Sequence, residues 1–520
     1  MRKKGLIIGF DGAPFKMIDK FLRENKLPFF SKIYKEGAFG ILESVIPAYT
    51  MVAWPCFYTG KNPAKIGPFL MKSKGFDPES FSKAFFVDST DIKTWTLWEY
   101  LSYLGYKVGV MHVPVTYPPK KINGFLITDF LTPKGAKDFA YPDYLLERLK
   151  NYRITSEMIG ERYGHPDSKI DVYKLKEDLI NILKEHGEMA LKLIEEFKPE
   201  FFIINFKELD DYMHFFYGEE KEILEIYRIA DLYSEKIYNL LNPDVFCIIS
   251  DHGFHKVPRT YFYINSFLEK KGYLKRAGGI KGKSSILIYE IGEKILRIVP
   301  FLRNLIPEKA KYKVAREHII HRVDWKNSKC FANWYAGVYF NEKFFKNEEE
   351  KKKFAEEIKK EFLNLKDEKG RKVFKIVYTK YEIFNGPYFD LMPEVVYTTE
   401  EDFRINPNLR NKIFDKRIDR PDLKGHHHAD MDGIFFIKGD KIKKGVYGER
   451  IKIYDIFVIF LYLLGEKIIK DVDGKIPENL FEEKPFPEFI DLVYKGVEER
   501  EVDEKEAEEI KKHLKGLGYI

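Results

Sequence analysis

The stretch Gly5-Leu-Ile-Ile-Gly-Phe-Asp11 decides the fold class, because it is an uninterrupted apolar run that ends on a carboxylate. Such a run is typical of a strand that is buried on both faces of a parallel sheet. The pattern returns at Phe201-Phe-Ile-Ile-Asn205 and at Phe246-Cys-Ile-Ile-Ser250. Segments with helical spacing lie between the runs, at Val172–Phe197 and Leu224–Leu241. This alternation predicts an α/β fold with a large, mainly parallel sheet and helices on both faces.

Acidic residues and histidines follow these apolar runs. Asp11 closes the first run, and Asp251 and His252 follow the third. Asp210 and His214 stand four residues apart after the second run, a spacing that ordinary helical pairs also show. In open α/β sheets, sites form at the edge where the strands end, so we expect these side chains to meet there. Asp and His together are suitable ligands for metal ions.

Two further segments carry residues that suit the same chemistry. Thr50 opens the segment Thr50-Met-Val-Ala-Trp54, which follows Pro47 at a predicted junction between a loop and a helix. Three adjacent histidines, 426 to 428, precede the strand-like segment Gly433-Ile-Phe-Phe-Ile437. A threonine hydroxyl becomes a competent nucleophile when metal ions lower its pKa. The sequence therefore indicates two metal ions with Thr50 between them.

The order of these segments resembles the alkaline phosphatase superfamily, and within it the type I phosphodiesterase/nucleotide pyrophosphatase family. The resemblance covers the chain from about Lys3 to Glu483. The family's nucleophile loop is similar to residues 46–63, and its Asp-x-x-x-His metal motif to Leu209–Tyr217. Its most recognisable signature is similar to Ser250-Asp-His-Gly-Phe254, and its closing Asp-Gly-Lys turn to Asp471–Ile476.

The resemblance implies a site for two divalent metal ions, with Zn²⁺ favoured by the mixed Asp/His ligands and Mn²⁺ as the alternative. It implies that one metal activates Thr50 and is held by Asp11, Thr50, Asp251 and His252. The other metal would be held by Asp210, His214 and one residue of the triple histidine. An apparent one-residue insertion near Ala429 leaves that last ligand open, with His428 nearest in sequence and His427 and His426 as alternatives.

The resemblance also implies an enzyme that cleaves phosphodiester or pyrophosphate bonds through a phosphothreonine intermediate. The aromatic neighbours Tyr49, Trp54 and Phe57 favour a nucleotide-like substrate. Sulfatases share this fold but require Cys or Ser where Thr50 stands, and an Arg where Trp54 stands. A phosphomonoesterase or phosphomutase of the same superfamily, and a scaffold that only binds a phosphorylated ligand, stay open as alternatives.

The bulk composition sets further expectations. A hydrophobic fraction of 44% allows one large core, and we expect a single catalytic domain over residues 1–520. The net charge of +7 is small beside 88 basic and 81 acidic residues, which indicates no nucleic-acid partner but suits a small phosphorylated substrate. Three cysteines without a CxxC pair favour a reducing cytoplasm. No segment has the length of a transmembrane helix, and no feature indicates an oligomeric state.

One region interrupts the alternation of strands and helices. A glycine-rich loop at Ala277–Ser284 is followed by the apolar and basic stretch Ile286–Ile306. We interpret residues 261–321 as a helical insertion that covers the core of the catalytic domain. A helix at a membrane surface or against a partner is the alternative, because apolar and basic residues alternate there.

Overall fold

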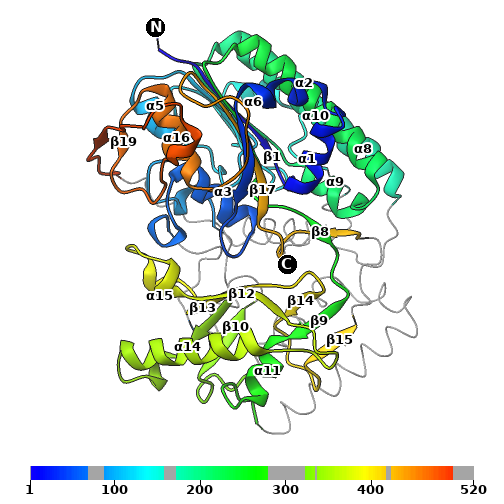
Figure 1. Cartoon of the computed structure of the whole chain (residues 1–520), viewed down its shortest axis with the longest axis vertical. Coiled ribbons are helices and arrows are strands. Elements are labelled where there is room, and N and C mark those ends of the chain that lie inside the picture. Colours follow the sequence, from blue (N-terminus) through cyan, green and yellow to red (C-terminus); the bar gives the residue numbers. More distant parts are fainter. Residues whose placement is uncertain are drawn as a thin grey trace.

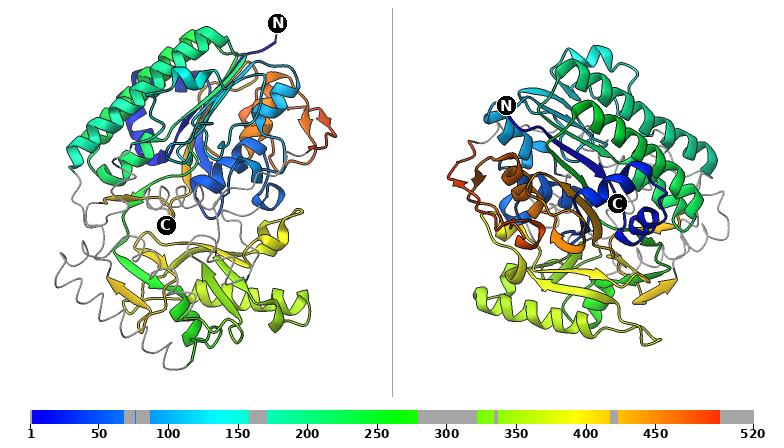
Figure 2. Two further views of the ribbon diagram at one scale, coloured as in Figure 1. Left: turned by 180° about the vertical axis from the view of Figure 1, so that it is seen from behind. Right: turned by 45° about the horizontal axis from the view of Figure 1, so that its top comes forward.

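The fold is seen in a computed structural model, which describes residues 2–67, 76, 87–156, 158, 171–278, 322–333, 337–416 and 423–495. The described residues form two lobes, each with its own apolar core (Figures 1 and 2). The larger lobe holds the predicted sheet, and the smaller lobe is built from residues between about 260 and 416.

A nine-stranded sheet forms the larger lobe, in the order β18-β2-β17-β7-β1-β6-β3-β4-β5. Its strands are β1 (Gly5–Phe10), β2 (Ala38–Glu43), β3 (Val108–Met111), β4 (Gly124–Ile127), β5 (Ala140–Tyr141), β6 (Phe201–Phe206), β7 (Val245–Ile249), β17 (Asp432–Lys438) and β18 (Val446–Lys452). Strand β1 pairs in parallel with β6 and β7, whereas β17 is antiparallel to β7 and β2, and β5 is antiparallel to β4. The sheet is therefore mainly parallel, as predicted.

Helices cover both faces of this sheet (Figure 1). One face packs against α1 (Phe15–Arg23), α2 (Pro28–Ile33), α8 (Val172–Phe197), α9 (Glu208–Phe216) and α10 (Glu220–Leu241). The other carries α3 (Thr50–Thr59), α5 (Leu97–Tyr103) and α16 (Asp455–Leu464). Because both faces are covered, every residue of β1, β6 and β7 is buried, which explains their continuous apolar runs.

The smaller lobe is inserted between β7 and β17. It contains a four-stranded sheet, β10 (Cys330–Asn333), β11 (Gly337–Phe340), β13 (Val395–Thr399) and β12 (Phe374–Thr379), and a three-stranded sheet, β14 (Phe403–Asn406), β9 (Thr260–Tyr263) and β15 (Phe414–Lys416). The helices α11 (Ile264–Lys270), α14 (Glu348–Asn364) and α15 (Lys380–Ile383) pack on these sheets. Where the chain crosses between the lobes, the short strands β8 (His255–Lys256) and β16 (Gly425–His426) pair with each other.

The predicted α/β class is confirmed, whereas most of the predicted insertion is not described. The described part of the predicted insertion begins with β9 and α11, and residues 279–321 lie outside the described residues. The strands and helices after residue 324 do not rejoin the large sheet until β17. The single domain with an insertion at 261–321 stays a prediction.

Two smaller expectations concern cysteines and membranes. Cys56, Cys247 and Cys330 are all buried and free, so the described chain has no disulfide framework. Among the described helices, none combines the length and the apolar character that crossing a bilayer requires.

Candidate metal and phosphoryl-transfer site

Three predicted segments meet at the carboxyl edge of the large sheet. The parallel register pairs Phe10 of β1 with Phe206 of β6, and Gly9 with Ile249 of β7. Because the three strands end at the same level, the segments that follow them emerge side by side. This is the edge at which α/β proteins build their sites.

Asp11, Asp251 and His252 form the first ligand group, with ligand atoms that all lie within 4.8 Å of one another. His252 Nε2 lies 3.3 Å from Asp251 Oδ2 and 3.9 Å from Asp11 Oδ1. All three side chains are fully buried. The structure thus assembles the three residues that the sequence placed after β1 and β7.

Thr50 is the first residue of α3, and it faces this first group. Its Oγ1 lies 3.3 Å from His252 Nε2. The preceding residue, Tyr49, gives α3 no side-chain cap, so the first turn of the helix presents backbone N–H groups at the site. A helix N-terminus of this kind favours an anionic group such as phosphate.

Asp210, His252 and His427 form a second ligand group, again with ligand atoms within 4.8 Å of one another. His427 Nε2 lies 4.0 Å from Asp210 Oδ1, and its ring stacks on the His252 ring at a centroid distance of 4.0 Å. His214 Nε2 lies 3.6 Å from Asp210 Oδ2. Asp210 and His214 share one face of α9 because they stand one helical turn apart.

The triple histidine divides between two surroundings, because of its strand pairing. His426 lies in β16 opposite His255 of β8, and the two rings stack at 5.9 Å. Successive side chains of an extended segment point in opposite directions, so His427 turns away from His255 and toward Asp210. His428, the residue nearest to the expected position in sequence, instead lies beside the Tyr49 and His426 rings, at 5.9 and 3.7 Å. The structure therefore brings His427, rather than His428, into the ligand group.

Backbone carbonyls fix the orientation of two of these histidines. His214 Nδ1 is 3.1 Å from the Gly425 carbonyl oxygen, and His252 Nδ1 is 3.0 Å from the Gly253 carbonyl oxygen. Because a carbonyl only accepts, each Nδ1 carries the proton and donates it. Each Nε2 is then left with its lone pair, the arrangement found in metal-binding histidines.

Several buried polar atoms of the site lack a hydrogen-bond partner among the described residues. They are Asp11 Oδ1, Asp210 Oδ1, His214 Nε2 and Asp251 Oδ2. An unsatisfied buried acceptor costs about 1–3 kcal/mol, and more when it is charged. All four atoms are acceptors or lone-pair donors that a divalent cation would satisfy, so the residues present fit the metal ions that the resemblance implies.

The carboxyl groups of the site differ in how readily they ionise. Burial raises the pKa of Asp11 well above its usual value, and the Asp251 carboxyl raises it further. Burial and then Asp210 raise the pKa of Asp251 to about 7. Burial opposes the ionisation of Asp210 as well, but Lys207 and His214 outweigh it and hold the pKa of Asp210 below its usual value. Burial lowers the pKa of His214 to about 4, so its ring is neutral at pH 7.

Two residues that orient Asp11 could not be inferred from their positions in the sequence. Trp54 Nε1 and Asn205 Nδ2 both donate to Asp11 Oδ2, at 3.2 and 3.0 Å. Trp54 and Phe57 are fully buried, so they support the site from within the core rather than face a substrate. Of the three aromatic residues taken to favour a nucleotide, only the partly exposed Tyr49 is placed to contact one.

Lys207 was also missed, although it follows β6 directly. It is 3% exposed, and its Nζ lies 2.5 Å from Asp210 Oδ2 and 2.9 Å from Asp211 Oδ1. Its position could have indicated a role in the site, because Lys207, like the predicted ligands, is a polar residue at a strand end. Its residue type did not suggest such a role, since lysine is not a common metal ligand.

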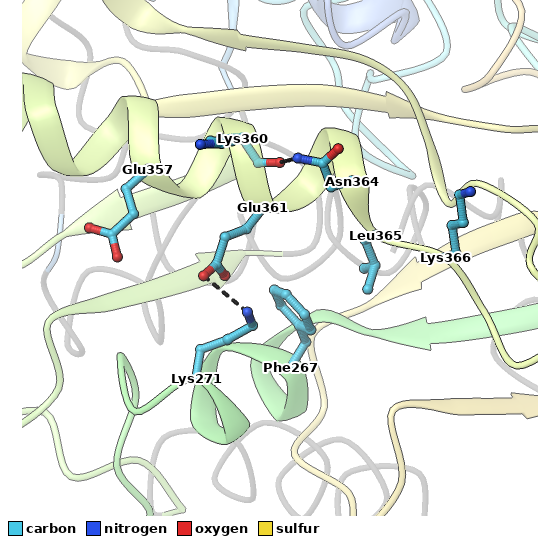
Figure 3. Close-up of a pocket in the computed structure, with 8 residues that line it drawn as sticks. All are labelled: Phe267, Lys271, Glu357, Lys360, Glu361, Asn364, Leu365 and Lys366. Atoms are coloured by element: carbon cyan, nitrogen blue, oxygen red, sulfur yellow. Dashed lines mark hydrogen bonds and ion pairs between the residues drawn. The ribbon is translucent and has the colours of Figure 1, made fainter.

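A separate groove of about 510 Å³ lies between α11 and α14 in the smaller lobe. Its lining mixes Lys271, Glu357, Lys360 and Glu361 with the apolar Phe267. Figure 3 shows Lys271 and Glu361 paired across it, and their Nζ and Oε1 atoms are 3.0 Å apart. None of the predicted site residues lines this groove.

Comparison with known proteins shows the family and supports the fold. Residues 6–430 match the family described as type I phosphodiesterase/nucleotide pyrophosphatase. Among solved structures, human ectonucleotide pyrophosphatase/phosphodiesterase 5 is 14% identical with a TM-score of 0.51, and the match covers 92% of this chain and 100% of that one. Phosphonoacetate hydrolase from Sinorhizobium meliloti 1021, in complex with phosphonoformate, is 14% identical with a TM-score of 0.54, over 89% of this chain and 96% of that one. No curated protein sequence matches this chain.

At 14% identity, the two solved structures establish the fold alone. The family match extends over most of the chain, from β1 through the triple histidine. The chain therefore belongs to the type I phosphodiesterase/nucleotide pyrophosphatase family of the alkaline phosphatase superfamily, and it is a hydrolase of the phosphodiesterase/pyrophosphatase type.

Proposed function

We propose that this protein hydrolyses phosphodiester or pyrophosphate bonds of a nucleotide-like substrate with two divalent metal ions, through a phosphothreonine formed on Thr50. The observation that supports it most is the position of the Thr50 hydroxyl. It lies at the N-terminus of α3, 3.3 Å from His252 Nε2, and His252 belongs to both ligand groups. A nucleophile there reaches a phosphorus atom held between the two groups.

The ligand assignment follows from the two groups. Asp11, Asp251, His252 and Thr50 would hold one ion, and Asp210, His214 and His427 the other, with His427 taking the place first given to His428. Such ions lower the pKa of a bound hydroxyl and stabilise charge on the leaving oxygen. Zn²⁺ suits this Asp/His set best, and Mn²⁺ is the alternative.

The side chains and backbone of the chain supply the remaining steps. The Thr50 hydroxyl lies 3.3 Å from His252 Nε2 and would release its proton to solvent, because the Nε2 lone pair would be given to the metal ion. The N–H groups at the start of α3 bind a non-bridging phosphate oxygen and orient phosphorus for in-line attack. Tyr49, at the edge of the site beside His427 and His428, is placed to contact the organic part of the substrate.

The free thiols also support a cellular location. Cys56, Cys247 and Cys330 are buried and unpaired with one another, so the fold does not depend on an oxidising compartment. We propose that the protein acts in the cytoplasm. Fractionation of the source cells tests this directly, and recovery of the protein outside the cytoplasmic fraction would contradict it.

The Thr50→Ala variant tests the nucleophile. We expect turnover on a panel of nucleotide diesters and pyrophosphates to fall by at least about a thousandfold, because an acceptor for the phosphoryl group is lost. The matched control is Thr59→Ala at the other end of α3, where the hydroxyl only donates to the Pro55 carbonyl at 2.6 Å. Metal content, measured by mass spectrometry, should stay near the wild-type value in both variants.

The stereochemistry at phosphorus separates this mechanism from its competitor. Two successive in-line displacements retain the configuration of a chiral phosphorothioate substrate, whereas direct attack by water inverts it. Inversion would remove Thr50 from the role of nucleophile. Turnover that persists in metal-free protein would refute the metal dependence and leave His252 as a general base.

A further inference from the structure

Lys207 introduces a fixed positive charge into the Asp210 half of the site. Its side chain is buried, and its Nζ contacts Asp210 Oδ2 at 2.5 Å and Asp211 Oδ1 at 2.9 Å. The ammonium also lies 5.2 Å above the centre of the Phe130 ring. Lysine is rarely buried unless it is paired, so these contacts hold the charge at a defined place.

Lys207 lowers the pKa of carboxyl groups beyond the two that it contacts. Against the effect of burial, it lowers the pKa of Asp210 and contributes in the same direction at Asp211. Weaker effects of the same sign act on Asp11 and Asp251, the carboxyl groups of the other ligand group. Lys207 thus stabilises a cluster of buried carboxylates that would otherwise repel one another.

The same position creates a conflict with a bound cation. Asp210 Oδ2 already accepts the Lys207 ammonium, so only Asp210 Oδ1 is left for a cation, and His214 Nε2 lies 3.6 Å from the occupied oxygen. A divalent cation held by Asp210 and His214 would meet the like charge of Lys207 at short range. Two like charges held this close repel each other strongly, because little water is present to screen them.

Asp211 is a second carboxylate that can accept the Lys207 ammonium in place of Asp210. It is 4% exposed, it stands one residue beyond Asp210 in α9, and its Oδ1 already contacts Lys207 Nζ. A small rotation of the long lysine side chain would keep the contact with Asp211 while it releases Asp210. Among the described residues, no carboxylate with the role of Asp211 is seen beside the Asp11–Asp251–His252 group.

We propose that Lys207 is an internal counter-cation that competes with a metal ion for Asp210, so that the Asp210 half of the site fills second and more weakly. Asp211 receives the ammonium when the second ion binds. The inference rests on the proposed two-metal function and adds an order of loading to it. Lys207 is a positioning residue in this scheme, because it acts through Asp210 and not on the substrate.

Titration of metal-free protein with Zn²⁺, followed by calorimetry and equilibrium dialysis, measures the two dissociation constants and their ratio. For the wild type we expect two unequal sites. In Lys207→Met, the second ion should bind at least about tenfold more tightly, because the competing charge is gone. In Asp211→Asn, the second ion should bind more weakly relative to the first, because Lys207 loses its alternative partner and stays on Asp210.

Lys380→Met is the matched control. Lys380 is also buried and paired with a buried carboxylate, at 3.3 Å from Glu394 Oε1, but it lies in the smaller lobe. This variant should leave the ratio of the two Zn²⁺ dissociation constants unchanged. It shows whether the loss of any buried lysine perturbs metal binding through general destabilisation.

The outcomes separate this inference from the proposed function. If the wild type binds two ions but Lys207→Met leaves their ratio unchanged, the inference is wrong and the two-metal function stands. If the wild type binds no ion, the proposed function itself fails. If Lys207→Met does not fold without metal, Asp211→Asn decides alone. The proposed competition would then be wrong if the ratio of the second to the first Zn²⁺ dissociation constant in Asp211→Asn equals the wild-type ratio or is closer to one.

Discussion

Two buried carboxyl groups at the same edge of the large sheet have opposite surroundings. Asp129 follows β4, and its two oxygens accept hydrogen bonds from Leu131 N at 2.7 Å, Thr116 N at 2.8 Å and Thr116 Oγ1 at 3.0 Å. Asp251 follows β7, and only its Oδ1 accepts a bond, from Gly12 N at 3.2 Å, while Oδ2 has no partner among the described residues.

The two groups are alike in their position after a strand, in their burial and in the direction of their pKa shift. Each is an Asp shortly after an apolar strand, each is fully buried, and burial raises the pKa of each, to about 6 for Asp129 and to about 7 for Asp251. The difference lies in what satisfies their oxygens. Asp129 closes a loop with protein donors, whereas Asp251 keeps an acceptor for a cation. Unsatisfied acceptors, more than burial, therefore distinguish a site from a structural carboxyl group.

The largest expected effect follows from replacement of Asp251. Asp251→Asn keeps the shape of the side chain but removes a charged metal ligand, so turnover should fall by at least about a thousandfold, given the several kcal/mol that a catalytic metal supplies. Bound metal, counted by mass spectrometry, should fall with it. The unfolding free energy of the metal-free protein should not fall, because the carboxylate has no full set of partners to lose. A variant with full metal content and full turnover would contradict the assignment of Asp251.

Asp129→Ala should lower the stability of the protein but leave metal binding and turnover unchanged. It leaves three buried donors, on Leu131 and Thr116, without an acceptor, and we expect a loss of about 4 kcal/mol of unfolding free energy at 1–3 kcal/mol for each donor. Urea denaturation measures this loss. The metal content and the kcat of the folded fraction should stay close to the wild type. A large loss of metal with unchanged stability would make Asp129 part of the site and remove the contrast with Asp251.

The smallest effect is a pH dependence of stability that Asp129 contributes. Burial raises its pKa from 3.8 to about 6, so between these values the folded protein binds a proton that the unfolded chain does not. Stability from this group is therefore fully present below about pH 4 and is lost as the pH rises through about 6, by about 3 kcal/mol in all.

The Asp129→Asn variant isolates this contribution, because asparagine does not titrate. The difference in unfolding free energy between metal-free wild type and Asp129→Asn should decrease from pH 4 to pH 6.5. A difference that is constant or grows over this interval would show that the pKa of Asp129 is not raised in the folded protein.

Much of the site was predictable because its signals are local. Asp11 and Asp251 follow apolar runs that form β1 and β7, and parallel strands that end together bring such residues to one edge. Asp210 and His214 share a helical face through their spacing alone. Thr50 was expected at a junction between a loop and a helix, and it is the first residue of α3.

The rest depended on contacts between segments far apart in the sequence. His427 enters the ligand group because His426 pairs with His255, which lies 171 residues earlier in the chain (426 − 255). The Lys207 ammonium, proposed to compete for Asp210, lies 5.2 Å from the centre of the Phe130 ring, which belongs to a distant segment of the chain. The extent of the smaller lobe depends on pairings such as β14 with β9, which no local pattern specifies.

The sequence by itself determined the class of fold and indicated the candidate ligands and the candidate nucleophile, because strand and helix periodicity and the residues at strand ends are local properties of the chain. Only the tertiary structure decided which histidine lies beside Asp210, which of the aromatic residues are buried and where a buried lysine contacts Asp210. Those outcomes depend on which atoms approach within a few ångströms after folding, and on which buried polar atoms are left without a protein partner.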